Sequence, residues 1–268
     1  MLKLLIYYNW KIILTEFKRL RWKFLKPNSH KSYNIYAKFR LKLINNGDIA
    51  AILYQNSHLV RFNKGWEYDT FKYLEENLGL GNVVLDIGAN IGVHAMFMAN
   101  IVGANGTVFS FEPNKRIANL FKTNCQLNNV HNVVLTEKAL GSRPGILNLT
   151  IPDLTLKDKL GGDAWGYVTE KTSEGKILDK VEVITLDSFF EENNILSLDL
   201  IKIDIEGAEL NCLKGATETL KKYKPKIVFE CFEEYQERFD YSTVDLLIFL
   251  QSFGYKFRQF DLFQWVAY

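Results

Sequence analysis

The chain has 268 residues, a length that suits one large domain or one domain with an extension. Its 33 basic side chains nearly balance 31 acidic ones, which argues against the broad basic surface of a nucleic-acid-binding protein. With 47% hydrophobic and 24% charged residues, the composition is that of an ordinary globular protein. The three cysteines, Cys125, Cys212 and Cys231, lack metal-site spacing, so we expect reduced thiols and a cytoplasmic location.

Residues 1–30 are predicted to form a basic, aromatic, helical N-terminal arm. The apolar stretch from Leu2 to Trp10 is too short to cross a bilayer, and no small-residue cleavage site follows it. Two interpretations of the arm stay open. It could pack on its own domain or on a second subunit. Alternatively, residues 1–26 could lie at the inner face of a membrane, with aromatic side chains at the headgroups and basic ones against anionic lipid.

The next segment is predicted to form a hairpin and a helix. Strands from Ala37 to Ile44 and from Ile49 to Tyr54 would pair around the turn Asn45-Asn46-Gly47-Asp48. A helix is expected from about Thr70 to Leu78. Glu67, just before that helix, could reach a bound cofactor, although an acidic residue near a helix N-terminus also stabilises the helix itself.

The segment Asn82 to Gly92, N-V-V-L-D-I-G-A-N-I-G, combines a strand, a glycine turn and the start of a helix. The apolar run from Val83 to Leu85 predicts a strand buried on both faces, and Val93 to Ala99 continues as a largely apolar helix. This order places unpaired backbone N–H groups at the carboxyl end of the strand, where open α/β sheets bind anionic or polar ligands. The candidate ligand contacts of the turn are Asp86, Gly88, Ala89, Asn90 and Gly92.

A second acid follows at the spacing typical of a nucleotide-type site. Glu112 ends the predicted second strand, twenty residues after Gly92, and could accept hydrogen bonds from ribose hydroxyls, with Pro113 beside it. The glycine pattern is D-x-G-x-N-x-G rather than G-x-G-x-x-G, and it resembles the S-adenosylmethionine-binding loop of class I methyltransferases. The alternative is an α/β domain whose glycine turn is purely structural.

Strands and helices continue to alternate after Glu112, which predicts a parallel, doubly wound sheet with right-handed crossovers. An amphipathic helix is expected from Asn114 to Asn128, and the third strand from Asn132 to Thr136. In this architecture the loop after the third strand forms a wall of the adenine pocket. The candidate adenine contacts are therefore Glu137, Lys138 and Ala139.

A long polar segment, residues 152–180, separates two further predicted strands, Gly145 to Ile151 and Val181 to Leu186. Loops of this length in a compact domain are usually functional. Trp165 and Tyr167 have glycine neighbours in this segment and could stack on a sugar ring. A surface loop anchored by one aromatic side chain is the alternative.

The segment D-L-I-K-I-D-I-E-G-A-E, residues 199–209, carries three charges on a predicted central strand. Side chains alternate along a strand, so Lys202, Asp204 and Glu206 would share one face. Charges on a covered strand are costly unless they are paired or solvated in a cleft, and Lys202 could reach either acid. Beside the glycine turn these charges indicate an active site, with a structural ion cluster as the alternative.

Several of these motifs together resemble the FkbM-type methyltransferases: D-I-G-A-N-I-G, F-E-P-N, the segment 199–209, L-K-G-A, and I-V-F-E ending at Glu230. The resemblance covers roughly residues 60–268. It implies a Rossmann-like, doubly wound, mostly parallel seven-stranded sheet in an α/β domain, here residues 31–268 with a core from about 66. The sheet would close with an antiparallel strand pair, Tyr255 to Phe260 and Phe263 to Tyr268.

The resemblance further implies S-adenosylmethionine as methyl donor and a hydroxyl acceptor, often on a sugar of a glycan, glycolipid or secondary metabolite. Such an in-line displacement needs a positioned acceptor and a base for its proton. Asp204 is the first candidate base, although it could instead contact the cofactor. Glu206, His94 and Glu230 follow, Lys202 would orient the carboxylates, and Glu230 is also a candidate sugar contact.

His94 departs from the pattern, because it stands after the glycine turn where a tyrosine would be more familiar. Three roles for His94 stay open: it could act as a base, it could contact the carboxylate of the cofactor, or it could be an ordinary helix residue. The acids could also hold a divalent metal that grips a sugar diol, but no ligand spacing is decisive and no metal is predicted.

Three other functions stay open. The first is methyl transfer to a small metabolite, protein or RNA, and the near-neutral charge counts against RNA. The second is a nicotinamide-dependent oxidoreductase, whose glycine spacing the sequence lacks. The third is a non-catalytic binding module, since a fold does not determine function. The sequence does not predict an oligomeric state.

Overall fold

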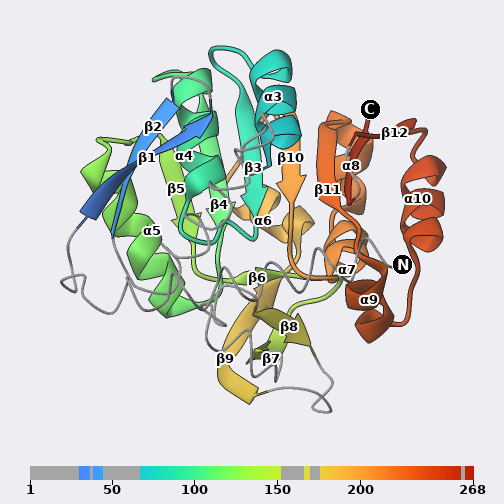
Figure 1. Ribbon diagram of the computed structural model, residues 1–268. Coiled ribbons are helices and arrows are strands. Elements are labelled where there is room, and N and C mark those ends of the chain that lie inside the picture. Colours follow the sequence, from blue (N-terminus) through green and yellow to red (C-terminus); the bar gives the residue numbers. More distant parts are fainter. Residues whose placement is uncertain (1–29, 37–38, 45–66, 152–165, 170–175, 261–262) are drawn as a thin grey trace, which may run out of the picture.

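The computed structural model describes residues 30–36, 39–44, 67–151, 166–169, 176–260 and 263–268. Its main sheet has seven strands in the order β12–β13–β11–β10–β3–β4–β5 (Figure 1). The strands are β3 Val83–Ile87, β4 Thr107–Phe111, β5 Val133–Thr136, β10 Leu200–Ile203, β11 Lys226–Glu230, β12 Phe257–Gln259 and β13 Gln264–Ala267.

The strand directions confirm the predicted doubly wound, mostly parallel sheet. β10 pairs in parallel with β3 and β11, and β4 pairs in parallel with β3 and β5. β13 is antiparallel to both of its neighbours, β11 and β12, so the predicted C-terminal antiparallel pair is also confirmed.

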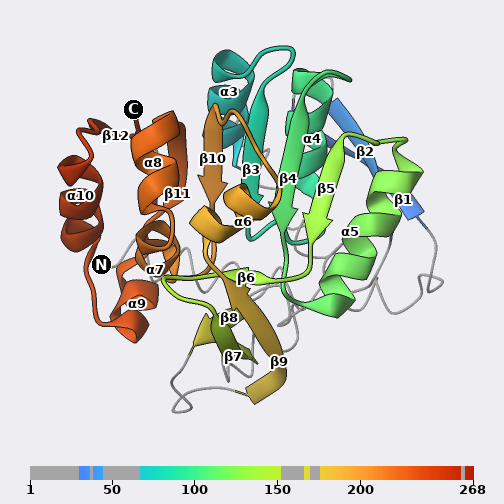
Figure 2. The same cartoon turned by 180° about the vertical axis from the view of Figure 1, so that it is seen from behind.

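Helices cover both faces of this sheet and form one hydrophobic core on each (Figures 1 and 2). One face carries α3 Tyr68–Asn77, α4 Val93–Val102 and α5 Lys115–Leu127. The other carries α6 Leu186–Glu192, α7 Glu209–Lys214, α8 Thr217–Tyr223 and α10 Thr243–Ser252. Successive strand residues point to opposite cores: Val84 packs in the first and Leu85 in the second. This two-sided burial explains why the central strands are continuous apolar runs.

A second, four-stranded sheet lies beyond the carboxyl ends of the parallel strands (Figure 1). Its order is β6–β9–β7–β8, from β6 Ala139–Leu140, β7 Gly145–Ile151, β8 Tyr167–Thr169 and β9 Lys176–Ile184. The prediction of one polar loop over residues 152–180 is therefore wrong where β8 and the first half of β9 lie. Only Lys180 to Val183 of β9 alternate between polar and apolar residues, and pairing with β7 stabilises the strand. The remaining residues of that segment, Trp165 included, lie outside the described ranges.

The hairpin that the structure describes differs from the predicted one. β1, His30–Tyr36, pairs with β2, Phe39–Ile44, in antiparallel register. The predicted strand from Ala37 to Ile44 corresponds to β2, and its partner among the described residues is β1. The sequence analysis did not predict β1, because the residue pattern of this strand is a weaker hairpin signal than the Asn-Asn-Gly-Asp turn. The predicted strand at 49–54 and the arm, residues 1–29, lie outside the described residues, and among those described no helix could span a membrane.

Candidate active site

The glycine turn between β3 and α4 packs directly against the end of β10. Gly88 has a φ of +79°, and a Cβ placed on it would lie 1.9 Å from the carbonyl oxygen of Asp204. Gly92 has a φ of +88°, and a Cβ there would lie 2.8 Å from the ring of Phe121 in α5. The two glycines thus allow the close approach of three elements, as well as a backbone conformation that other residues rarely adopt.

Replacing Gly88 with alanine is expected to lower the free energy of unfolding by about 4 kcal/mol or more, because backbone atoms must move apart. Gly81 is a matched control, since its φ is +83° and no atom lies within 4 Å of the position that a Cβ would take. Gly81→Ala carries only the left-handed backbone cost of about 1–2 kcal/mol. Urea unfolding of both variants measures the difference, and equal losses would contradict the steric argument.

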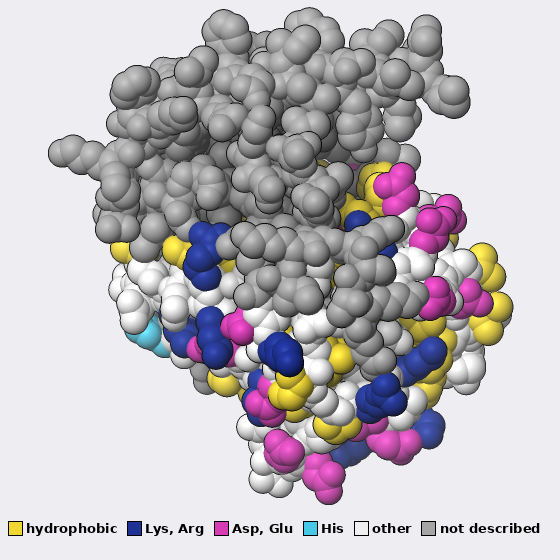
Figure 3. All heavy atoms as spheres, turned by 90° about the horizontal axis from the view of Figure 1, so that it is seen from below, with side chains coloured by type: hydrophobic (Ala, Val, Ile, Leu, Met, Phe, Trp, Pro, Cys, Tyr) yellow, Lys and Arg dark blue, Asp and Glu magenta, His cyan; other side chains and the backbone are white. Residues whose placement is uncertain are grey.

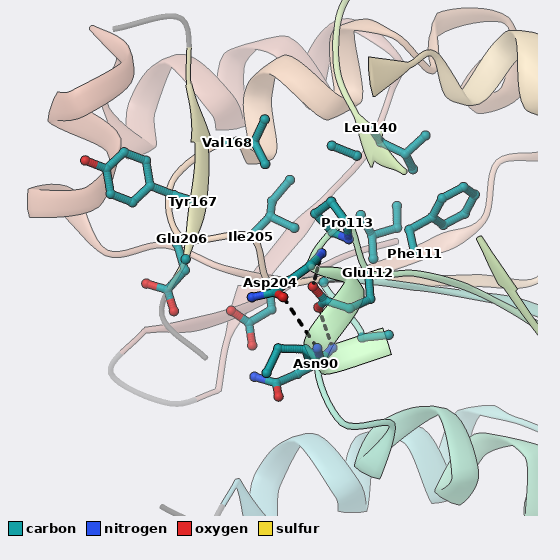
Figure 4. A pocket seen from close by; sticks show the side chains of 18 of the residues that line it. Asn90, Phe111, Glu112, Pro113, Leu140, Tyr167, Val168, Asp204, Ile205 and Glu206 are labelled. Atoms are coloured by element: carbon teal, nitrogen blue, oxygen red, sulfur yellow. Dashed lines mark hydrogen bonds between the residues drawn. The ribbon is translucent and has the colours of Figure 1, made fainter. Parts of the chain in front are cut away.

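A cavity opens where β3, β4 and β10 end, and the four-stranded sheet forms its far wall (Figure 4). Most predicted site residues line it: Glu67, Gly88, Ala89, Asn90, His94, Glu112, Pro113, Lys138, Ala139, Tyr167, Lys202, Asp204 and Glu206. Four others, Asp86, Gly92, Glu137 and Glu230, are not part of its wall. The sequence analysis did not predict Asn114 or the apolar lining, which comprises Ile87, Ile91, Val93, Phe111, Ile117, Leu140, Leu149, Val168, Ile205 and Ala208.

Glu112 joins the end of β4 to the glycine turn. Its Oε2 accepts a hydrogen bond from the backbone N–H of Asn90 at 3.0 Å, and its Oε1 accepts one from Asn114 at 2.9 Å (Figure 4). Burial raises the pKa of Glu112 to about 7, against the opposing effect of these two N–H donors. Asn114 also caps α5, because its Oδ1 accepts from the backbone N–H of Arg116 at 3.1 Å.

Lys202 is a buried ammonium between two carboxyl groups. Its Nζ lies 3.2 Å from Oδ2 of Asp204 and 3.8 Å from Oδ1 of Asp86, and the residue is 3% exposed. Burial lowers the pKa of Lys202, but the two carboxylates outweigh it and hold the pKa above its usual value. Burial raises the pKa of Asp86, whose oxygens accept no hydrogen bond from any described residue. Asp86 is thus a hidden partner of Lys202 rather than a wall residue.

Asp204 is the exposed member of this group, with 25% of its side chain accessible. Burial would raise its pKa, but Lys202 outweighs that effect through its charge and its hydrogen bond, so the pKa lies below its ordinary value. Asp204 also shares a hydrogen bond with Glu230, which lies behind it at the end of β11. Burial, then the charge of Asp204, raises the pKa of Glu230 well above its usual range. The shared proton therefore belongs to Glu230, and Asp204 carries the negative charge.

The predicted strand alternation through Glu206 is wrong beyond Ile203, where β10 ends. Glu206 adopts a φ of +58° and Gly207 a φ of +106°, so the chain turns sharply. A Cβ on Gly207 would lie 2.3 Å from the carbonyl oxygen of Tyr235, which explains the glycine. The side chains of Asp204 and Glu206 still reach one cavity because of this turn.

His94 and Glu67 meet at the wall of the cavity. The Nε2 atom of His94 lies 2.9 Å from Oε2 of Glu67, and the imidazole stacks on Phe71 with ring centres 4.7 Å apart. His94 is the second residue of α4, and Glu67 precedes α3 with a φ of +47°. A bound molecule would therefore meet a His94–Glu67 pair rather than an isolated imidazole.

The remaining predicted contacts divide between the cavity and its surroundings. Glu137 forms an ion pair with Lys122 outside the cavity, whereas Lys138 lines the cavity and pairs with Glu182 at 2.6 Å. Tyr167 is 5% exposed, and the guanidinium of Arg238 lies over its ring. That ring face is closed to a sugar. Within the described part of the chain, no three His, Cys, Asp or Glu side chains converge as a metal site.

The sequence matches the family model of the methyltransferase FkbM domain over residues 86–257, well over half of the chain. Methyltransferase 1 of Beauveria bassiana is 26% identical over 187 residues, which are 64% of this chain and 72% of the relative. The hexuronic acid methyltransferase AglP of Haloferax volcanii is 27% identical, with coverages of 60% and 61%. The 2-O-methyltransferase NoeI of Sinorhizobium fredii is 29% identical, with coverages of 52% and 59%.

The chain thus spans less than two thirds of the length of the last two relatives. Among solved structures, an FkbM methyltransferase from Methylobacillus flagellatus is similar with a TM-score of 0.46 and 16% identity, over 84% of this chain and 56% of that one. The family match covers the glycine turn, Glu112 and the segment 199–209. The chain therefore belongs to the FkbM methyltransferase family and is an S-adenosylmethionine-dependent methyltransferase.

Proposed function

We propose that this enzyme methylates a hydroxyl group of a sugar in a glycan, a glycolipid or a glycosylated metabolite. The observation that carries the proposal is the ionised, partly exposed carboxylate of Asp204 in the cavity wall. Lys202 and Glu230 hold it in place, and its side chain stays partly accessible in the cavity where an acceptor would lie. A carboxylate is suited to orient a hydroxyl group and to take up its proton.

The cavity also suits the methyl donor. Each carboxylate oxygen of Glu112 accepts one hydrogen bond from a backbone N–H group. Each oxygen can accept a second one, which would come from a ribose hydroxyl. Such added hydrogen bonds would favour the ionised form of a carboxyl group that burial now disfavours. Pro113, Ala139 and Leu140 offer apolar surface for an adenine ring. When bound, S-adenosylmethionine supplies an electrophilic methyl group.

The low pKa of Asp204 is compatible with a role as base. A free sugar hydroxyl is a much weaker acid than a carboxylic acid, so proton transfer before methyl transfer would be unfavourable. As the oxygen begins to bond to the methyl carbon it gains positive charge, and its proton becomes strongly acidic. A weakly basic carboxylate in hydrogen-bonding distance is then sufficient. Glu206 and the His94–Glu67 pair are the second candidates for contacting the acceptor.

The name of one relative supports a sugar-type acceptor, since AglP is a hexuronic acid methyltransferase, and that of NoeI, a 2-O-methyltransferase, supports an oxygen acceptor. A small metabolite or protein acceptor is the alternative on the same fold. A cytoplasmic location fits three cysteines without a disulfide partner. Membrane contact through residues 1–26 stays a prediction, because those residues lie outside the described structure.

Methyl transfer to a panel of acceptors tests the proposal. S-adenosylmethionine labelled in its methyl group is incubated with neutral sugars, acidic sugars, sugar phosphates, glycosides and the matching aglycones. Non-sugar acceptors, including a catechol, a peptide and an RNA, complete the panel. We expect label only in sugar-bearing acceptors, and NMR of the product should place the new methyl on an oxygen that was a hydroxyl group of the sugar. Labelling of an aglycone, peptide or RNA without labelling of any sugar would overturn the proposal.

A further inference from the structure

We propose that a second cavity beside the active site binds an anionic group of the acceptor, a carboxylate or a phosphate, through Arg238. The inference rests on the proposed function, because it concerns the acceptor of the same reaction. It makes Arg238 a residue that determines which sugars the enzyme accepts.

The second cavity lies between the four-stranded sheet and η4 Glu237–Phe239, the 3₁₀ turn that follows the short helix α9 Glu233–Gln236. Three of its lining residues, Leu140, Val168 and Ala208, also line the first cavity. The two cavities therefore adjoin each other along a shared wall. One molecule of sugar size could place a hydroxyl in the first cavity and a substituent in the second.

Arg238 is held in the second cavity between two tyrosine rings. The central carbon of its guanidinium lies 4.7 Å from the ring centre of Tyr167 and 4.5 Å from that of Tyr235. Stacking of this kind fixes the plane of a guanidinium and leaves its edge available for a bidentate oxyanion. Tyr167 also lines the first cavity, so the stack links the two sites.

The guanidinium has an unused donor. Its Nη1 atom is buried and has no hydrogen-bond partner, and none of the described carboxylates forms an ion pair with Arg238. A buried donor without a partner is costly, and native structures rarely keep one without a reason. An oxyanion in the second cavity would supply the missing counter-charge through the part of the guanidinium that lines it.

The position of Arg238 is fixed relative to the candidate base. The carbonyl group of Tyr235 lies against Gly207: a Cβ placed on Gly207 would be 2.3 Å from the carbonyl oxygen of Tyr235. The hydroxyl of Tyr241 donates to the carbonyl of Gly207 at 2.7 Å, which ties the other end of η4 to the same turn. Gly207 follows Asp204 by three residues. The fold therefore presets the separation between an anion at Arg238 and a hydroxyl at Asp204.

The two cavities differ in the balance of charge along their walls. Acids outnumber lysines in the first, where Glu67, Glu112, Asp204 and Glu206 stand against Lys138 and Lys202. Basic residues outnumber acids in the second, where Arg143, Lys180 and Arg238 stand against Asp240. An anionic substituent would therefore favour the second cavity over the first. Figure 3 looks onto this side of the molecule and shows basic and acidic side chains interspersed on the part of this face that is coloured, so the cavities differ in charge without a matching separation there.

Pairs of acceptors that differ only in charge test the inference. One pair is a uronic acid glycoside and its uncharged primary-alcohol counterpart, and the other is a sugar phosphate and the free sugar. We expect the wild-type enzyme to prefer at least one anionic member. Arg238→Gln should lower kcat/KM for that acceptor by about 10- to 100-fold, mainly through KM, because hydrogen bonds to charged groups are lost. The neutral member should change by less than about threefold, or about 0.7 kcal/mol, because it has no anionic group to lose its contact with Arg238.

Two further variants control the experiment. Arg258→Gln removes an exposed arginine of β12, which lines neither cavity, and should leave both acceptors unaffected. Arg238→Lys keeps the positive charge but loses the planar group that can donate two parallel hydrogen bonds. It should therefore retain part of the preference for the anionic acceptor. Calorimetric titration with S-adenosylhomocysteine verifies that each variant is folded. If Arg238→Gln does not bind it, Arg238→Lys takes its place in the comparison.

The outcomes separate this inference from the proposed function. If sugars are methylated with no preference for either anion, or if Arg238→Gln affects neutral and anionic acceptors equally, the inference is wrong and the proposed function stands. If no sugar is methylated whatever its charge, the proposed function fails and the inference fails with it. Which pair shows the preference identifies the anion as a carboxylate or a phosphate.

Discussion

Asp204→Asn is expected to reduce kcat by about 10²- to 10⁴-fold, the usual contribution of a positioned general base. Asparagine retains the shape of the side chain and can still receive a hydrogen bond from Lys202, which lies 3.2 Å away in the wild type. It cannot take up the proton of the acceptor hydroxyl. The affinity for S-adenosylmethionine should change by less than about fivefold, or about 1 kcal/mol, because asparagine keeps the shape and the acceptor oxygen of the side chain.

Two other variants make this prediction specific. Glu206→Gln also removes a carboxylate from the cavity wall, but Glu206 has no contact with Lys202 among the ion pairs of the described residues, so we expect a much smaller loss of kcat. Glu112→Ala should show the opposite pattern, with weakened cofactor binding and a kcat that is largely retained at saturating cofactor. Single-turnover kinetics and calorimetry with S-adenosylhomocysteine measure the two quantities separately. A full kcat in Asp204→Asn would exclude Asp204 as the base.

The predictions that the structure confirms depend on local patterns. The strand at Val83 and the helix at Val93 follow from apolar runs and a glycine turn, and the spacing from Gly92 to Glu112 follows from one crossover helix. Residues at the ends of parallel strands meet at one edge of the sheet, so Glu112 and Asp204 could be placed in one site from the sequence alone.

The features that sequence reasoning missed depend on contacts between distant segments. β8 is three residues long and is stabilised by pairing with β7, which no local pattern reveals. The turn at Glu206 follows from the close approach of Tyr235, which lies far along the chain in α9. The proton shared by Asp204 and Glu230 requires the parallel register of β10 and β11. The stack of Arg238 between two tyrosines likewise joins the small sheet to the C-terminal helices.

Lys202→Met is expected to lower the free energy of unfolding by about 3–5 kcal/mol near pH 8, the usual effect of removing one partner from a buried ion pair. Methionine fills a similar volume, so the loss is electrostatic. It leaves Asp86 completely buried without a counter-charge, and none of its oxygens has a hydrogen bond to compensate. Lys226→Met is the control, because Lys226 pairs in register with the same strand at Leu200 but is exposed. Its effect should stay within about 0.5 kcal/mol.

The pH dependence of this loss tests its electrostatic origin. Burial already raises the pKa of Asp86, and removing Lys202 should raise it further while ending the depression of the pKa of Asp204. A carboxyl group with a raised pKa in the folded state binds more protons there than in the unfolded chain, so the free energy of unfolding falls as pH rises. The loss of unfolding free energy in Lys202→Met, relative to the wild type, should therefore appear above about pH 4, near the ordinary pKa of aspartic acid. It should increase with pH until Asp86 and Asp204 are both ionised.

The double variant Asp86→Asn/Lys202→Met should recover at least half of the lost stability at pH 8, because it removes the uncompensated buried charge together with its former partner. Urea unfolding of wild type, both single variants and the double variant at pH 5 and pH 8 completes the cycle. A loss that is the same at both pH values and is not relieved by Asp86→Asn would mean that Lys202 stabilises the fold by packing alone. A pH-dependent loss that Asp86→Asn relieves would mean that Asp86 is the buried counter-charge that keeps Lys202 ionised beside Asp204.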